Sequence, residues 1–444
     1  MTYFGDDFTG SSDVLLQYTR AGLQGMLFLE VPTETELKAA ADGQDAIGIA
    51  GITRSMRPEQ ILPIVSETFQ LLASLSPRVV QYKICSTADS GTRSGSIGPA
   101  VEVGRALFGN EPVPILTAQP GLGRYTVFGN HFARGTEGMV ERLDRHPMAS
   151  HPVTPMSEAD LSRHFSAQIG SAVGLLDLVT LRAGGGANAL NRLRREDVKA
   201  YVIDGLEDTD LEIAARMILS DSPRTTFAIG SGGLSIGLAR ARPTGGFEKA
   251  KQVATPELCL AVSGSASVQT TRQIDRAIER GWHTIYLSPA SLEAGADRAL
   301  TISRVKDEAA EMLNAAPGVV VYTSHRGTPL HSQLQDPSAI GAALAEVITH
   351  CRQELNVERV VVAGGDTSGF VLRNLRARTL TAQGTVGSDL LLGSITSYDK
   401  SLDGLEVVLK GGQLGSLDVF EEARTYSSLD REGSTLDRAV IDDE

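Results

Sequence analysis

Short apolar runs alternate with amphipathic stretches along most of the chain. In the first half, this pattern predicts helices at Val14–Ala21 and Glu59–Ser74 and strands at Thr2–Gly5, Asp45–Gly51, Arg78–Ile84, Ala200–Asp204 and Thr226–Gly230. Strands that alternate with helices are typical of βαβ units, and such units build mostly parallel sheets. The first half is therefore predicted to be an α/β domain.

The alternation lapses around Arg240–Pro256, where proline, glycine and charged residues follow one another without an apolar period. It then resumes, with predicted strands at Leu258–Ser263, His283–Leu287, Gly318–Thr323, Arg359–Gly364 and Glu406–Lys410. We predict an N-terminal domain at 1–240, a linker at 241–256, a C-terminal domain at 257–425 and an acidic tail at 426–444. The predicted fold class is α/β, with two domains whose mostly parallel sheets face a central cleft.

Composition excludes several classes of function. The 444 residues carry a formal net charge of −13 and only 5% aromatic residues, which disfavours binding of nucleic acid. No apolar run approaches the ~18 residues that span a membrane. The three cysteines are widely spaced, and the histidines lack metal-ligand spacing, so no structural zinc site is predicted. These features predict a cytoplasmic protein.

An acidic turn follows the first predicted strand. Asp6 and Asp7 are adjacent, and hydroxyl residues follow them at the start of a helix. Thr9, Ser11 or Asp13 could serve simply as helix caps. Capping does not explain two neighbouring carboxylates, which repel each other at close range. We therefore expect one of the pair to bind a substrate hydroxyl or act as a general base.

Cationic residues follow other strands. Arg54 comes after the second strand, and a carboxylate-binding role competes with that of a solvated surface residue. Lys83 opens a loop rich in hydroxyls and glycines, and a charge inside a strand needs a partner. Arg124 follows a glycine pair, which is a weak signal. Cys85 lies in the same loop as Lys83, but no adjacent histidine supports a nucleophilic role.

Glycine-rich turns recur after strands in both halves. They lie at Gly230–Leu234, Ser263–Ser267, Ala363–Gly369 and Lys410–Gly415. Such turns allow backbone N–H groups to approach phosphate, although capped helix starts or plain turns explain several of them about as well. None has the P-loop ending or the G-x-G-x-x-G spacing. Asp366 either holds magnesium or caps a helix, and Lys410 either reaches phosphate or is an exposed turn residue.

Taken in order, these motifs resemble the four-carbon acid sugar kinase family over nearly the whole chain. The matching segments are DDFTG at Asp6–Gly10, KICST at Lys83–Thr87, GR at Gly123–Arg124, GSGGL at Gly230–Leu234, SGSAS at Ser263–Ser267, GGDTSG at Gly364–Gly369 and KGGQLG at Lys410–Gly415. The sequence departs from the family pattern at Cys85, where the family has aspartate, and at Asp366, where it has glutamate. The Cys85 variant resembles a subgroup acting on a branched or oxidised acid such as 3-oxo-isoapionate.

The resemblance implies an ATP-dependent kinase that phosphorylates a hydroxyl of a small sugar acid such as threonate, erythronate or 3-oxo-tetronate. It implies Mg²⁺ as cofactor, a homodimer, and Asp7, or failing that Asp6, as the base. The implied substrate-binding residues are Arg54, Lys83, Ser86 and Arg124. The implied nucleotide-binding residues are Ser265, Gly364, Gly365, Asp366, Thr367 and Gly412.

Two rival functions make different predictions. An NAD-dependent sugar-acid dehydrogenase predicts a G-x-G-x-x-G turn after a strand, and the sequence has none. A non-catalytic sensor of sugar acids or nucleotides does not require the acidic pair at Asp6 and Asp7. The kinase is therefore the favoured hypothesis, and release of ADP in the presence of a sugar acid distinguishes it from a sensor.

Overall fold

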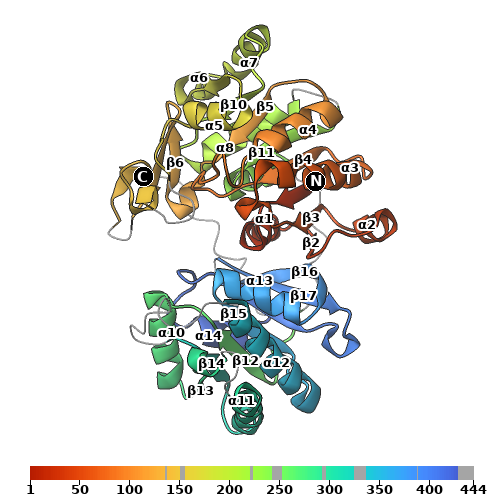
Figure 1. Ribbon diagram of the computed structural model, residues 1–444, viewed down its shortest axis with the longest axis vertical. Helices are drawn as coiled ribbons and strands as arrows, with labels where there is room; N and C mark the ends of the chain where they lie inside the picture. Colours follow the sequence, from red (N-terminus) through yellow and green to blue (C-terminus); the bar gives the residue numbers. More distant parts are fainter. Residues whose placement is uncertain are drawn as a thin grey trace, which may run out of the picture. The chain divides into compact units, whose positions relative to one another are not determined.

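The computed structural model describes residues 1–135, 138–150, 156–220, 224–242, 253–292, 297–324, 337–387 and 389–428. Its chain divides into two compact units, residues 1–246 and 247–444 (Figure 1). Most of the predicted linker and of the predicted acidic tail lies outside the described residues. Within the described ranges, no helix is both long and apolar enough to cross a membrane.

The first unit is a parallel sheet with helices on both faces. Its strands are β1 (Thr2–Gly5), β2 (Gly25–Phe28), β3 (Ala46–Ala50), β4 (Val79–Lys83), β5 (Val113–Leu116), β9 (Val173–Leu176), β10 (Ala200–Ile203) and β11 (Thr226–Gly230). Its helices are α1 (Phe8–Arg20), α2 (Glu34–Ala41), α3 (Pro58–Ala73), α4 (Gly98–Phe108), α5 (Leu161–Ile169), α6 (Leu178–Arg182), α7 (Gly186–Arg195), α8 (Asp208–Ser220) and α9 (Gly232–Arg240).

The strand order of this sheet places the candidate residues together. The order is β2-β3-β1-β4-β11-β5-β10-β9, and the paired strands are parallel. After β1 the chain forms β2 and β3 on one side of β1, and after β4 it forms β5 on the opposite side of the sheet. Parallel sheets bind ligands at the carboxyl ends of their strands where such a reversal occurs. The ends of β1, β3, β4, β11 and β5 are therefore the place to look for a site.

Alternate strand residues build two cores, one on each face of this sheet. Val80 and Ile115 belong to the core under α3, together with Phe69 of that helix. Their neighbours Val79 and Leu116 belong to the opposite core, which is covered by α8 and α9. Burial on both faces explains why these strands are rich in apolar residues.

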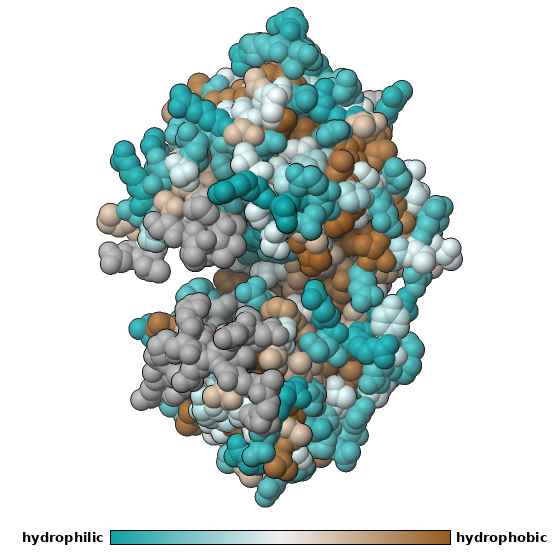
Figure 2. Space-filling model, in the orientation of Figure 1, coloured by the Kyte–Doolittle hydropathy of each residue, from teal (hydrophilic) through white to brown (hydrophobic). Residues whose placement is uncertain are grey.

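Helix α7 illustrates the amphipathic pattern of the outer layer. Ala189, Leu190 and Leu193 are buried, whereas arginines occupy its last turn. In Figure 2 the outward surface of this helix, at the top of the view, is hydrophilic. A small antiparallel sheet of β6 (Arg124–Val127), β7 (Asn130–Arg134) and β8 (Val140–Arg142) is inserted after β5.

The second unit is a mixed sheet, also covered by helices. Its strands are β12 (Cys259–Ser263), β13 (His283–Tyr286), β14 (Val319–Tyr322), β15 (Arg359–Ala363), β16 (Ala377–Val386), β17 (Leu390–Ser397) and β18 (Glu406–Lys410). Its helices are α10 (Val268–Glu279), α11 (Arg298–Leu313), α12 (Pro337–Leu355), α13 (Gly365–Asn374) and α14 (Val419–Thr425).

Parallel pairing dominates one half of this second sheet. The order is β13-β14-β12-β15-β18-β17-β16. The first five strands in this order pair in parallel, whereas β17 pairs antiparallel with both β18 and β16. Val361 packs with residues of α10 and α14 in one core. The carboxyl ends of β12, β15 and β18 lie side by side and carry the three glycine-rich turns. The predicted α/β fold class is confirmed, and the antiparallel strands β16 and β17 are an addition to it.

Candidate active site

The two adjacent aspartates of the acidic turn have different surroundings. Asp7 is the N-cap of α1, where its Oδ1 accepts a hydrogen bond from the Gly10 N–H and its Oδ2 accepts one from Arg54 at 2.7 Å. Asp6 is only 5% exposed, and its Oδ1 has no hydrogen-bond partner among the described residues. The N-cap of α1 is therefore Asp7, and not Thr9, Ser11 or Asp13, which the sequence offered as candidates.

Burial is the main cause that raises the pKa of Asp6, to about 7. The neighbouring charge of Asp7 raises it further, whereas Lys83 and Arg54 oppose the shift. A carboxyl group with such a pKa exchanges its proton near neutral pH. This property suits a general base, which works best when its pKa lies near the operating pH.

Arg54 links the acidic turn to the loop that follows β4. Its Nη1 contacts Asp7, and its Nη2 donates to Asp89 Oδ2 at 2.6 Å. The backbone N–H of Arg54 donates to the Asp6 carbonyl at 3.0 Å. Asp89 is 4% exposed, so the ion pair also compensates a buried charge. Arg54 therefore has two carboxylate partners within the chain.

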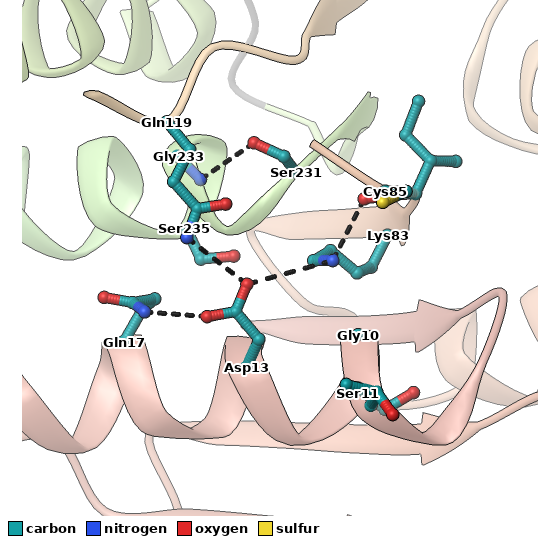
Figure 3. A network of polar contacts seen from close by, with 12 residues as sticks. Gly10, Ser11, Asp13, Gln17, Lys83, Cys85, Gln119, Ser231, Gly233 and Ser235 are labelled. Carbon is teal, nitrogen blue, oxygen red and sulfur yellow. Dashed lines mark hydrogen bonds and ion pairs between the residues drawn. The ribbon is translucent and has the colours of Figure 1, made fainter. Parts of the chain in front are cut away.

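Lys83 is buried at the end of β4, with a side chain only 4% exposed. Its ammonium donates to the Ile84 carbonyl at 3.0 Å and lies 3.9 Å from Asp13 Oδ2 (Figure 3). Asp13 also accepts from Gln17 at 2.8 Å. The partner that the sequence required for Lys83 is thus Asp13, one of the residues considered as a cap.

The loop carrying Cys85 and Ser86 is fixed by the inserted small sheet. His131 of β7 is fully buried, and its Nε2 lies 2.7 Å from the Ser86 carbonyl. Since a carbonyl only accepts, Nε2 carries the proton, and Nδ1 accepts from Thr126. Burial lowers the pKa of His131 to about 4, which keeps the ring neutral. Burial, followed by the charge of Asp89, raises the pKa of the Cys85 thiol and keeps it protonated.

Arg124 starts β6, and its hydrogen-bond partners among the described residues are backbone carbonyls. Its Nη1 donates to the carbonyls of Leu122 and Gly123 at 3.0 and 3.3 Å, and its Nε is buried without a partner among the described residues. Its backbone pairs with that of Gln119. The guanidinium can therefore accept an additional anionic partner.

The second unit brings the three glycine-rich turns together. The Gly364 N–H donates to the Lys410 carbonyl at 2.8 Å, and the Gly264 N–H donates to the Ala363 carbonyl. The Ser265 hydroxyl accepts from Thr270 Oγ1 at 3.1 Å. The Gly412 carbonyl accepts from Ser267, the N-cap of α10.

Glycine is required at the start of α13. Gly364 has φ +121°, and a Cβ there would lie 2.6 Å from the Thr367 hydroxyl. Gly365 is the first residue of α13, and Asp366 is exposed in its first turn. Backbone N–H groups at a helix N-terminus are a suitable site for phosphate. The turn thus places N–H groups, Thr367 and Asp366 at one strand end.

Lys410 is completely buried at the end of β18, so its interpretation as an exposed turn residue is wrong. Its ammonium donates to Thr270 Oγ1 at 2.9 Å and to the carbonyls of Gly411 and Gly412 at 3.1 and 3.3 Å. Burial lowers the pKa of Lys410 to about 8. Lys410 therefore ties the Gly411–Gly412 turn to α10.

Comparison with known proteins assigns the two units to known domains. Residues 1–238 match the family model described as "Sugar-binding N-terminal domain", and residues 260–420 match "Nucleotide-binding C-terminal domain". The chain is thus a sugar-binding domain followed by a nucleotide-binding domain. It belongs to the four-carbon acid sugar kinase family.

Curated relatives align over almost the whole chain. A Paraburkholderia graminis protein named 3-oxo-isoapionate kinase is 35% identical over 96% of this chain and 94% of its own. A Methylobacterium radiotolerans protein named 3-oxo-tetronate kinase is 33% identical over 94% of this chain and 97% of its own. The family predicted from the motifs is therefore confirmed.

Solved structures share the fold. A Salmonella typhimurium structure described as a putative tRNA synthase has a TM-score of 0.80 at 24% identity, covering 95% of this chain and 98% of that one. A Haemophilus influenzae structure has a TM-score of 0.76 at 23% identity and covers 96% of this chain and 99% of that one. At this level of identity the similarity concerns the fold alone.

Proposed function

We propose that this chain is an ATP-dependent kinase that phosphorylates a hydroxyl of a small 3-oxo sugar acid, of the 3-oxo-tetronate or 3-oxo-isoapionate kind. The relatives' names support the reaction class. The observation that carries the mechanism is the asymmetry of the acidic turn. Both Asp7 oxygens are engaged, whereas Asp6 has a buried oxygen without a described partner and a pKa of about 7.

In this proposal Asp6 accepts the proton of the hydroxyl that attacks the γ-phosphate. Asp7 caps α1 and, with Asp89, fixes Arg54. Lys83 and Arg124 bind the anionic oxygens of the acid, with Ser86 beside them. These cations offset the negative net charge of the chain, which alone would repel an anionic substrate.

The nucleotide belongs to the second unit. The backbone at Gly364, Gly365 and Gly412, together with the hydroxyls of Ser265 and Thr367, forms a neutral surface suited to phosphate oxygens. Mg²⁺ in kinases is bound by one or two carboxylates and the substrate phosphates, and the exposed Asp366 fits that donor set. Asp366 would hold the ion, whose charge would offset the charge of the phosphates.

The experiment is a coupled ADP-release assay with Mg-ATP and a panel of four- and five-carbon sugar acids, including oxo and branched ones. We expect turnover with a 3-oxo acid. An Asp6→Asn variant should retain ATP binding, measured by calorimetry, while losing turnover. Turnover by Asp6→Asn at the wild-type rate would remove Asp6 as the base, and wild-type protein that binds no ATP would refute the kinase.

A further inference from the structure

Gln119 lies in the first unit just after β5 and is only 2% exposed. Its backbone pairs with that of Arg124, with N–O distances of 2.9 and 3.2 Å, which anchors the residue beside the candidate site. A buried amide has two donors and one acceptor group that need partners. The orientation of this amide therefore determines what it can bind.

Asp13 sets that orientation. The Gln119 Nε2 donates to Asp13 Oδ2 at 3.4 Å, and because a carboxylate only accepts, the amide nitrogen must face Asp13 (Figure 3). Asp13 is held in turn by Gln17, which donates to its other oxygen. The amide oxygen of Gln119 is thus turned away from the carboxylate.

Two glycines leave room for this arrangement. A Cβ at position 232 would lie 2.3 Å from Asp13 Oδ2 and 2.7 Å from Gln119 Nε2. A Cβ at position 233 would lie 1.8 Å from the Ala118 carbonyl. Gly232 therefore leaves room for the Asp13–Gln119 contact, and Gly233 allows the turn to approach the backbone just before Gln119.

The Oε1 atom of Gln119 is buried and has no hydrogen-bond partner among the described residues. Asp6 Oδ1 shares this property, and the charge of Lys83 acts on Asp6. A Cβ at position 10 would be 3.0 Å from Lys83 Nζ and 3.6 Å from Asp6 Oδ1, so both atoms face Gly10. Lys83 Nζ lies 3.9 Å from the same Asp13 oxygen that binds Gln119. The Lys83 ammonium is thus close to Asp6 and to Asp13, the residue that orients Gln119.

We propose that Gln119 is a specificity-determining residue whose Oε1 accepts a hydrogen bond from a hydroxyl of the sugar acid other than the one that is phosphorylated. A hydroxy acid supplies the complementary groups: one hydroxyl donates to Asp6, a second donates to Gln119, and an oxygen between them accepts from Lys83. The inference rests on the proposed function and adds that the enzyme selects for the second hydroxyl.

The test compares 2,4-dihydroxy-3-oxobutanoate with 4-hydroxy-3-oxobutanoate, which lacks the hydroxyl on C2, in wild type and in Gln119→Leu. In wild type, loss of this hydroxyl should lower kcat/KM by roughly 10–100-fold, because a buried acceptor stays unpaired. In Gln119→Leu the two compounds should differ by less than about threefold, since leucine has no acceptor to leave unpaired. A defect in folding alone would lower both values together and preserve their ratio.

Gln17→Leu is the matched control, because it removes the other donor to Asp13 and leaves Gln119 in place. It should keep the full difference between the two compounds. If Gln119→Leu keeps the wild-type ratio while wild type turns over the dihydroxy acid, the inference is wrong and the kinase stands. If wild type turns over neither compound nor any acid of the panel, the proposed function itself has failed.

Discussion

Replacing Asp6 by asparagine should abolish turnover and, at the same time, stabilise the protein above neutral pH. This combination is expected if Asp6 is a buried general base. Burial first, and then the charge of Asp7, hold the pKa of Asp6 at about 7, compared with 3.8 for an unperturbed aspartate. The folded protein therefore disfavours the carboxylate at neutral pH. Asparagine has nearly the same shape and carries no charge, so the variant removes the general base together with the electrostatic cost.

The size of this cost follows from proton linkage. The folded state keeps the Asp6 proton up to about pH 7, whereas the unfolded state loses it near pH 4. The free energy of unfolding therefore falls as the pH rises from about 4 to about 7, and the loss is complete above that window. The shift corresponds to an upper limit of about 4 kcal/mol. In Asp6→Asn the free energy of unfolding should not fall in this way, because asparagine has no proton to lose in this pH range.

The assay measures kcat/KM for the sugar acid and the melting temperature between pH 5 and pH 9, a range of about two pH units on each side of the pKa. Wild-type kcat/KM should rise about tenfold per pH unit below pH 7 and level off above it, because only the ionised base accepts a proton. Asp6→Asn should lose turnover by roughly 10²–10⁴-fold. It should also melt a few degrees higher than wild type at pH 8.

Asp7→Asn is the control. Asparagine remains a good N-cap, but the ion pair with Arg54 is lost, so this variant should melt lower than wild type. The reasoning is refuted if Asp6→Asn retains turnover, or if it is inactive and also melts below wild type at pH 8, because misfolding would then account for the loss.

Three further variants test the surrounding contacts. Gly364→Ala should weaken ATP binding about tenfold or more in calorimetry, because the added Cβ would collide with Thr367. Gly281→Ala is the control, since Gly281 also has a positive φ but has nothing within 4 Å of the added Cβ, and it should leave ATP binding unchanged. An equal loss of ATP binding in both variants would contradict the steric argument. Lys410→Met should raise the KM for ATP about tenfold or more and lower the melting temperature, since it removes the hydrogen bonds that hold the Gly411–Gly412 turn. An unchanged KM would show that ATP binding does not depend on these hydrogen bonds. Arg54→Gln should destabilise the protein by about 1–3 kcal/mol in urea unfolding because the buried Asp89 loses its ion pair with Arg54, and the double variant with Asp89→Asn should recover part of this loss.

Much of the fold could be predicted because both sheets are buried on two faces. Largely apolar strands such as Cys259–Ser263 and Val319–Tyr322 stand out from the amphipathic helices between them. The antiparallel strands Ala377–Val386 and Leu390–Ser397 were missed. Their glycines and threonines interrupt the apolar pattern, and their pairing depends on contacts that sequence periodicity does not encode.

The candidate site was only partly predictable. The motifs located Asp6, Asp7, Arg54 and Lys83, and the structure brings them together. Adjacent aspartates look equivalent in sequence, however, and only the cap on α1 and the burial of its neighbour distinguish them. Gln119 was missed, although a polar residue three positions after the end of an apolar strand could have signalled it. The homodimer and the cytoplasmic location stay predictions.

The most direct test of the central claim is transfer of label from [γ-³²P]ATP to 2,4-dihydroxy-3-oxobutanoate by the purified chain in the presence of Mg²⁺. The account predicts a labelled sugar-acid phosphate formed in equal amount to ADP, and no labelled acid with Asp6→Asn. Label released only as inorganic phosphate, or retained in ATP across the whole panel of sugar acids, would contradict it.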